Sequence, residues 1–271
     1  MEETERADEA LRDLERRSPR AVLDVLLAGQ RRSLDAVEAA LPAIERAVAA
    51  AAERLGERGR LIYCGAGTSG RIGLLDAVEL GPTFDWPDAR RHVLLAGGEA
   101  SFGRTREGAE DDGAAGRAAL LATEPTPADV CLMLAASGRT PFTLAAAEAA
   151  RGAGALTVGL ANNPGAPLLD ACQHPILLRT GPEAVAGSTR LAAGTAQKAA
   201  LNLFSTLLMI RLGKVFRGRM VDMRPTNAKL RARACRIVSE VTGCSDDEAL
   251  AALRSSRGSI REAILAVEAV R

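Results

Sequence analysis

The sequence is poor in the residues on which several classes of protein depend. Its 271 residues include five cysteines and two histidines, and the cysteines never have the C-x-x-C spacing of a zinc or redox site. No apolar run approaches the ~20 residues that a membrane-spanning helix needs. The 35 basic and 34 acidic residues nearly balance, which gives no sign of binding to nucleic acid or an anionic membrane. We therefore expect a cytoplasmic protein that works without a metal, a cofactor, or a nucleic-acid or membrane partner.

The scarcity of histidine narrows the chemistry open to the chain. His92 and His174 both stand beside expected strands, where an edge position explains them better than catalysis does. If the protein is an enzyme that transfers protons, its acid and base are therefore expected to be carboxylates.

A glycine-rich turn between a strand and a helix is the main feature that is present. Leu61–Cys64 is a short apolar run, which is typical of a buried strand. The turn at residues 65–70 matches G-x-G-x-x-G, which alone is a weak signal of dinucleotide binding. Such a turn points N–H groups and the positive end of a helix dipole at an anion. The hydroxyls of Thr68 and Ser69 favour a terminal phosphate.

The same arrangement recurs after a second apolar strand, Val130–Ala135, where Ser137-Gly-Arg-Thr140 leads into Pro141 and a helix. Loops at the carboxyl ends of parallel strands can converge on one ligand, so we expect the two turns to hold one phosphate. Both could also be no more than well-capped turns. The candidate phosphate contacts are Thr68, Ser69, Gly70, Ser137, Gly138, Arg139 and Thr140.

Strand and helix alternate through the middle of the chain. This alternation predicts parallel strands with helices on both faces, so the expected fold class is α/β with a doubly wound, parallel five-stranded sheet. The expected strands are Leu61–Cys64, His92–Ala96, Val130–Ala135, Leu156–Leu160 and Pro175–Arg179. The expected helices include Phe102–Leu121, Phe142–Arg151 and Thr189–Leu212, the last with Ser188 as its N-cap.

Segments that contain helices but no strands are expected before and after the sheet domain in the sequence. On the N-terminal side they are Asp8–Arg16, Ala21–Leu27 and Ser33–Leu55, the last divided near Leu41 by Pro42. On the C-terminal side they are Thr226–Glu240, Ser245–Ser255 and Ser259–Val270, and Ser245 and Glu248 have the spacing of a capping box. We therefore expect an N-terminal helical region (1–56), a sheet domain (57–220) and a small C-terminal three-helix subdomain (221–271).

The longest motifs of the chain resemble those of one family. The motifs are Leu61–Arg71, Asp76–Glu79, Glu107–Asp111, Ala136–Pro141, Gly181–Lys198 and Thr226–Leu230. They resemble the N-acetylmuramic acid 6-phosphate etherases, and the block at 181–198 also resembles the glucokinase regulatory protein. The resemblance implies a sugar isomerase (SIS) domain that binds a phosphosugar, usually as a homodimer. The chain departs from the family pattern at Leu80-Gly81, at Ala192 and in its N-terminal region.

The resemblance also implies a reaction and assigns residues to it. The family cleaves the C3 lactyl ether of N-acetylmuramic acid 6-phosphate in cell-wall amino sugar recycling, giving N-acetylglucosamine 6-phosphate and D-lactate. By match to the family motif, Glu110 is the base that removes the C2 proton, and Glu79 is the acid that protonates the departing lactate. The substrate contacts implied in the block at 181–198 are Glu183, Ser188, Arg190 and Lys198.

The sequence alone leaves alternatives open for these residues. Glu79 could end a helix, and Glu110 could belong to the solvated acidic face of the helix at 102–121. A phosphosugar isomerase or a non-enzymatic sugar-phosphate sensor would use similar loops. A nucleotide-dependent oxidoreductase would need an acidic residue at the end of the second strand, where the chain has Gly97-Gly98.

Overall fold

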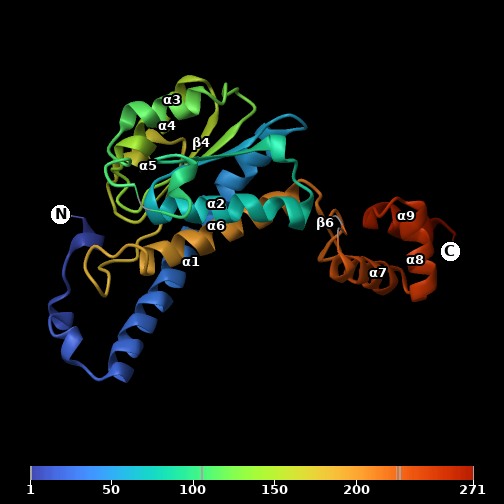
Figure 1. Ribbon diagram of the computed structural model, residues 1–271, viewed down its shortest axis with the longest axis horizontal. Coiled ribbons are helices and arrows are strands. Elements are labelled where there is room, and N and C mark those ends of the chain that lie inside the picture. Colours follow the sequence, from blue (N-terminus) through green and yellow to red (C-terminus); the bar gives the residue numbers. More distant parts are fainter. Residues whose placement is uncertain (1, 105, 224, 226, 271) are drawn as a thin grey trace. The chain divides into compact units, whose positions relative to one another are not determined.

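A computed structural model describes residues 2–104, 106–223, 225 and 227–270 (Figure 1). Thr226, where the sequence predicts the start of a helix, lies outside these residues. The chain divides into two compact units, Met1–Ala77 with Ala89–Thr206 and Val78–Asp88 with Leu207–Arg271, and each is described by itself. The three regions expected from the sequence stay a prediction. None of the helices formed by the described residues is both long enough and apolar enough to span a membrane.

The first unit is built on a parallel sheet. In the described part of the chain this sheet has five strands in the order β2-β1-β3-β4-β5, and every neighbouring pair is parallel. The strands are β1 (Leu61–Gly65), β2 (Arg91–Leu95), β3 (Val130–Leu134), β4 (Leu156–Ala161) and β5 (His174–Leu177). The three central strands are buried along their whole length, as apolar runs in a parallel sheet require. The predicted fold class is confirmed.

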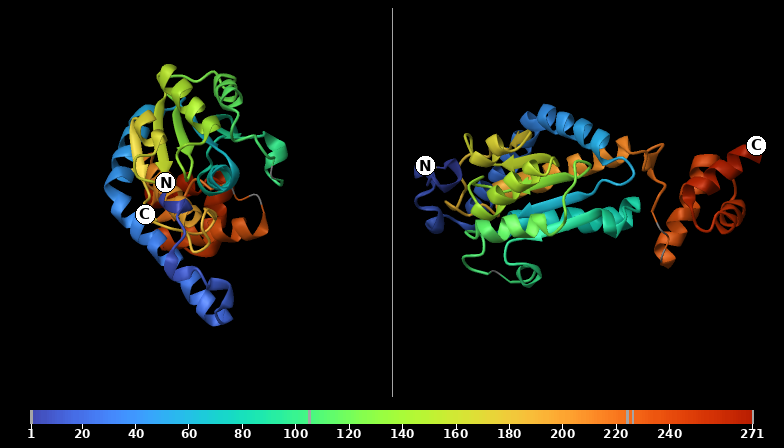
Figure 2. Two further views of the ribbon diagram at one scale, coloured as in Figure 1. Left: turned by 90° about the vertical axis from the view of Figure 1, so that its left-hand side faces the viewer. Right: turned by 90° about the horizontal axis from the view of Figure 1, so that it is seen from above.

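Helices cover both faces of the sheet, and alternation along the strands decides which core a side chain joins. Ile62 and Cys64 of β1 and Cys131 and Met133 of β3 share one core. The helices on that face are α3 (Gly113–Leu121), α4 (Pro141–Gly152) and α5 (Pro167–Ala171). The opposite face is covered by α1 (Pro19–Leu55) and by the turns of α2 (Gly67–Phe84) and α6 (Ala192–Arg211) that belong to this unit (Figure 2).

The first helix is continuous where the sequence predicts a break. α1 begins after Ser18, whose hydroxyl accepts the Ala21 N–H group at 3.3 Å, but it runs through Pro42 to Leu55. Proline inside a helix costs about 3 kcal/mol. The buried face of α1 includes Ile44 and Val48, and each large apolar side chain contributes about 1.5–3 kcal/mol. Burial therefore outweighs the lost hydrogen bond.

Residues before α1 form short turns in place of the expected helix Asp8–Arg16. The Asp8 carboxylate accepts the Ala10 N–H group at 3.0 Å, which favours a turn over a continuing helix. The turns are 3₁₀ helices η1 (Glu3–Glu5), η2 (Glu9–Leu11) and η3 (Leu14–Arg16).

The connection between β2 and α3 differs most from the prediction. The sequence predicts one helix over 102–121, whereas α3 begins only at Gly113 and residues 107–111 form a turn. Gly108 has a left-handed φ of +70°, which interrupts a helix. The Asp112 carboxylate then caps α3 by accepting the Ala115 N–H group at 2.8 Å. Glu110 therefore lies in a loop, and its assignment to a helix is wrong. Two 3₁₀ turns flank β2, η4 (Asp88–Arg90) and η5 (Glu99–Ser101).

The second unit contains the predicted C-terminal helices and a short hairpin. The helices are α7 (Ala228–Thr242), α8 (Asp246–Ser255) and α9 (Ile260–Val270), and the antiparallel hairpin is β6 (Val215–Phe216) with β7 (Arg219–Met220). The predicted capping box of α8 is confirmed, since Ser245 Oγ accepts the Glu248 N–H group and the Glu248 carboxylate accepts the Ser245 N–H group. The hairpin was not expected, because two-residue strands carry no periodic signal.

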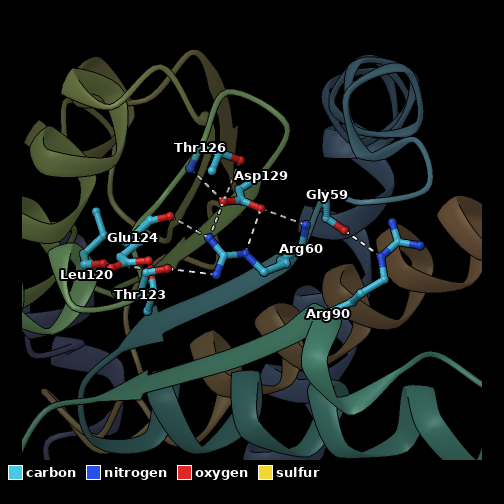
Figure 3. Close-up of polar contacts among 8 residues, drawn as sticks. All are labelled: Gly59, Arg60, Arg90, Leu120, Thr123, Glu124, Thr126 and Asp129. Atoms are coloured by element: carbon cyan, nitrogen blue, oxygen red, sulfur yellow. Dashed lines mark hydrogen bonds and ion pairs between the residues drawn. The ribbon is translucent and has the colours of Figure 1, made fainter.

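A buried ion pair joins the amino ends of β1 and β3 (Figure 3). Arg60 donates from Nε and Nη2 to the two carboxylate oxygens of Asp129 at 3.1 and 2.7 Å. The Arg60 N–H group donates to the same carboxylate at 2.9 Å, and Thr126 adds its N–H and hydroxyl at 2.8 and 3.1 Å. The Asp129 side chain is 1% exposed. These contacts of Arg60 and Thr126 with Asp129, called the clamp below, fix the register in which Leu61 pairs with Val130.

The contacts of the clamp also set the charge of Asp129. Burial raises the pKa of its carboxyl group, but the hydrogen bonds from Arg60 and Thr126 and the charge of Arg60 outweigh burial, so the pKa is lowered. A carboxyl group whose folded-state pKa is lowered adds stability above its unfolded-state pKa, near about 3.9. That stability is lost as the pH falls through the folded-state pKa.

We predict that Asp129→Asn lowers the free energy of unfolding by about 3 kcal/mol at pH 7, because it leaves the Arg60 guanidinium without a charged partner. Urea unfolding at several pH values measures this difference, which should shrink below about pH 4. Asp24→Asn is the control, since it breaks an exposed pair with Arg20 and should cost less than about 1 kcal/mol. Equal losses in the two variants would contradict a special role for the clamp.

Candidate active site

The two serine-bearing loops follow adjacent strands of the sheet. β1 and β3 are paired so that Gly65 faces Leu134 at their carboxyl ends. In the order β2-β1-β3-β4-β5, the connection after β1 leads to one edge of the sheet and the strands from β3 onward lie on the other side of β1, so the strand order reverses between β1 and β3. Open α/β sheets bind ligands at such a switch point. The candidate site is therefore the carboxyl edge between the loop at 65–70 and the loop at 135–140.

The first loop is also the first turn of α2. The Gly70 N–H group donates to the Ala66 carbonyl at 3.0 Å, so this amide belongs to the helix and not to a phosphate site. Helix geometry leaves the N–H groups of residues 67–69 without an intrahelical acceptor, and these replace Gly70 as candidate donors. Gly70 has a different role, because a Cβ atom there would lie 2.2 Å from a leucine side chain of β2.

The second loop forms hydrogen bonds within itself. Ser137 Oγ accepts the Arg139 N–H group at 3.1 Å, while the Gly138 N–H group donates to the Ala135 carbonyl at 3.0 Å. Thr140 is the N-cap residue of α4, and among the described residues its hydroxyl caps no backbone N–H group. The loop amide of Gly138 is therefore engaged in this conformation. The hydroxyls of Ser137 and Thr140 stay predicted phosphate contacts.

Glu110 contacts the first turn of α4 and lines a cavity together with the first loop. Its carbonyl accepts the Phe142 N–H group at 3.0 Å, which binds the loop at 102–112 to the first turn of α4. Glu110 also lines a cavity of about 210 Å³ together with Gly67, Arg71 and Ala96. The connections after β1 and β2 thus line the cavity beside the predicted base, and one backbone hydrogen bond joins this base to the helix that follows β3.

Glu79 lies inside α2 and not at its end. The helix continues through Gly81 and Pro82 to Phe84, so the explanation of Glu79 as a helix-end residue does not hold. Glu79 belongs to the second unit and Glu110 to the first. Their pairing across a substrate stays a prediction.

Asp76 has no individual role predicted from the sequence, yet it is the centre of a buried polar network. Its carboxylate accepts the Tyr63 hydroxyl at 2.8 Å, the Ser205 hydroxyl at 2.9 Å and Asn202 Nδ2 at 3.4 Å. Burial, followed by the charge of Asp76, raises the pKa of Tyr63 well above its ordinary value. The Asn202 side-chain oxygen accepts the Lys198 ammonium group. Asp76 therefore orients Asn202 and, through it, the predicted substrate contact Lys198.

Glu183 caps α6. Both of its carboxylate oxygens are used, because they accept the N–H groups of Ala192 and Ala193 at 2.9 Å each. α6 therefore begins at Ala192 and not at Thr189, and the predicted N-cap Ser188 is wrong. Whether Glu183 also touches a sugar stays a prediction.

The remaining predicted contacts lie in loops. The Arg139 guanidinium pairs with Glu2 at 3.2 Å. Ser188 and Arg190 lie between β5 and α6, where the Ser188 N–H group donates to the Val185 carbonyl at 2.9 Å. Their contact with a substrate stays a prediction.

The histidines do not belong to this edge. His92 and His174 lie near the amino ends of β2 and β5, and burial lowers the pKa of both. Within the described ranges, no group of three or more His, Cys, Asp or Glu side chains could hold a metal ion. The expectation that no cofactor is needed stays a prediction.

The chain matches known families in two overlapping regions. Residues 43–150 match the glucokinase regulatory protein N-terminal SIS domain. Residues 116–207 match the SIS domain. Together these regions contain the whole parallel sheet and both serine-bearing loops.

Two relatives that match nearly the whole chain have the same name. The chain is 52% identical over 262 residues to the N-acetylmuramic acid 6-phosphate etherase of Deinococcus radiodurans, with 97% of this chain and 86% of that protein covered. It is 47% identical over 264 residues to the protein of the same name in Rubrobacter xylanophilus, with 97% and 88% covered.

Solved structures share the fold at low identity. The Vibrio vulnificus NanR protein complexed with ManNAc-6P has a TM-score of 0.51 and 14% identity, over 70% of this chain and 65% of that one. The sugar isomerase domain of the RpiR transcription factor of Sphaerobacter thermophilus has a TM-score of 0.52 and 18% identity, over 71% and 91%. These similarities concern the fold alone, and they agree with the SIS domain.

We predict that the second loop does not tolerate a side chain at Gly138. A Cβ atom there would lie 2.4 Å from the Ala166 Cβ atom, whereas Gly165, with nearly the same φ, has open space around it. Gly165→Ala should lower the free energy of unfolding by about 1 kcal/mol, the cost of a left-handed alanine. Gly138→Ala should cost about 1–3 kcal/mol more through overpacking and should weaken binding of inorganic phosphate. Urea unfolding measures the two losses of stability, and titration calorimetry measures phosphate binding. Equal losses of stability would contradict the close packing of this loop.

Proposed function

Since the chain belongs to the family of N-acetylmuramic acid 6-phosphate etherases, we propose that it cleaves the C3 D-lactyl ether of N-acetylmuramic acid 6-phosphate to N-acetylglucosamine 6-phosphate and D-lactate. Identity of 52% over 97% of the chain to an etherase is the observation that carries this proposal. The reaction is a step of cell-wall amino sugar recycling. The proposal includes a homodimer that works in the cytoplasm on a small phosphosugar.

The phosphate is anchored between the two serine-bearing loops. The N–H groups of residues 67–69 and the dipole of α2 attract the dianion. The hydroxyls of Thr68, Ser69, Ser137 and Thr140 donate hydrogen bonds, and Arg139 supplies a positive charge. The position of both loops after adjacent parallel strands supports this anchor.

Elimination starts at C2 of the open-chain sugar. The C2 proton is acidic because the neighbouring aldehyde stabilises the charge left behind, and the Glu110 carboxylate takes this proton. Support for this role comes from the cavity that Glu110 shares with the first loop. The electron pair then forms the C2–C3 double bond while the C3–O bond breaks.

Lactate leaves with a proton from Glu79. Water then adds to C3 of the unsaturated aldehyde and gives its proton to Glu79, C2 regains a proton from Glu110, and the product is N-acetylglucosamine 6-phosphate. One carboxyl group must be ionised and the other protonated when the substrate binds, so their surroundings in the complex must differ. Glu183, Ser188, Arg190 and Lys198 hold the rest of the substrate.

We predict that the protein releases D-lactate from N-acetylmuramic acid 6-phosphate and that Glu110→Gln slows release by about 10²–10⁴-fold. The amide keeps the shape of the side chain but takes no proton, so inorganic phosphate should bind as before. A lactate dehydrogenase assay and titration calorimetry measure the two effects.

Glu99→Gln is the matched control for this test, because it removes an exposed carboxylate from the same connection between β2 and α3 and should leave the rate unchanged. Phosphate binding by the wild type without lactate release would favour the sensor. Formation of a ketose phosphate would favour the isomerase.

A further inference from the structure

Residues Glu2–Glu5, called here the N-terminal strap, lie at the carboxyl ends of β3 and β4 in the first unit (Figure 2). Thr4 is fully buried. Its N–H group donates to Asn163 Oδ1 at 3.2 Å, and its hydroxyl accepts Asn163 Nδ2 at 3.0 Å. Asn163 also donates to the Ala136 carbonyl at 3.0 Å, directly before Ser137. The strap is therefore fastened to the second serine-bearing loop.

The strap also holds the segment between β5 and α6. The Thr4 carbonyl accepts the Gly187 N–H group at 3.0 Å, next to the predicted substrate contact Ser188. Glu3 forms an ion pair with Arg179 at 2.6 Å. The strap thus connects two segments to which the proposed function assigns substrate contacts.

Glu2 forms an ion pair with Arg139, the cationic residue of the second loop. Its Oε1 atom lies 3.2 Å from Arg139 Nε, and the Glu2 and Arg139 side chains are 21% and 56% exposed. Because Thr4 is anchored two residues away, Glu2 is held at this position. The pair lines a cavity of about 390 Å³ whose wall is formed by Glu2, Glu3, Arg6, Arg139, Asn163 and Pro164. A guanidinium group assigned to an anionic substrate is therefore neutralised by the chain's own carboxylate.

We propose that Glu2 is an internal competitor for Arg139, which the phosphate of the substrate displaces on binding. This inference rests on the proposed function. The N–H donors of a guanidinium group bind a carboxylate or a phosphate. A phosphomonoester dianion brings more charge than one carboxylate and replaces Glu2, whereas an unphosphorylated sugar or a simple carboxylate gains nothing by the exchange. Glu2 thereby makes the loop selective for a dianion at some loss of affinity.

Glu2→Gln tests the competition directly in the full-length protein. A partly exposed ion pair is weak, so its removal should lower the Kd of inorganic phosphate by about three- to fivefold. KM for N-acetylmuramic acid 6-phosphate should fall by the same factor while kcat stays unchanged, because Glu2 takes no part in the chemical step. Titration calorimetry with inorganic phosphate and the lactate-release assay measure these constants.

Two further variants show whether the effect passes through Arg139. Asp13→Asn removes the same charge from a pair with Arg17 and should change neither constant. In an Arg139→Gln background, Glu2→Gln should have no effect on phosphate binding. Unchanged, weaker or absent phosphate binding in Glu2→Gln would overturn the inference, and so would an equal gain in the Arg139→Gln background.

The calorimetric test separates this inference from the proposed function, because phosphate binding needs no turnover. If Glu2→Gln binds phosphate more tightly but the wild-type protein releases no lactate, the proposed function is contradicted and the competition by Glu2 is supported. If the wild-type protein releases lactate but Glu2→Gln has an unchanged Kd for phosphate, the proposed function is supported and the competition by Glu2 is contradicted.

Discussion

The parallel pairing of β1 with β3 is the constraint on which the rest of the first unit depends. Their register is fixed at the amino ends by the clamp of Arg60 and Asp129, and it carries through to Gly65 and Leu134 at the carboxyl ends. A slip of one residue would turn every strand side chain to the other face and would move one serine-bearing loop relative to the other. The stability of one edge and the geometry of the candidate site at the other are therefore set by the same ladder.

Two kinds of carboxylate in the first unit have different uses. Asp129, Asp76 and Glu183 are buried and accept several hydrogen bonds each. They tie strand to strand, helix to strand and loop to helix, so their oxygen atoms already accept hydrogen bonds within the protein. Glu110 instead lies in an exposed turn beside a cavity. Proton transfer requires a carboxylate of this second kind, because the group must change its charge and its partner during the reaction.

Local signals in the sequence were sufficient for the sheet and for both serine-bearing loops, because an apolar run followed by glycine and a helix is decided within about ten residues. Most features that the sequence did not predict depend on contacts between distant segments. Pro42 is tolerated because α1 buries its face on the sheet, and Thr4 is fixed by Asn163, 159 residues away. Glu183 caps the first residue of α6, Ala192, which lies nine positions further along the chain. The turn at Gly108 was missed for another reason, since its neighbours are helix formers and only the left-handed conformation of the glycine ends the pattern.

An anion site at a switch point does not by itself decide the reaction, because function resides in side chains added to a fold. A phosphosugar isomerase and an etherase both begin by removing the proton next to the carbonyl of an open-chain sugar. The isomerase then returns a proton to the neighbouring carbon, whereas the etherase expels the substituent at C3. A base such as Glu110 is therefore common to both reactions, and the acid that protonates the leaving group separates them. It follows that the fold shared with solved structures at 14% and 18% identity does not distinguish the two, and that the distinction depends on the acid, for which Glu79 is the proposed residue.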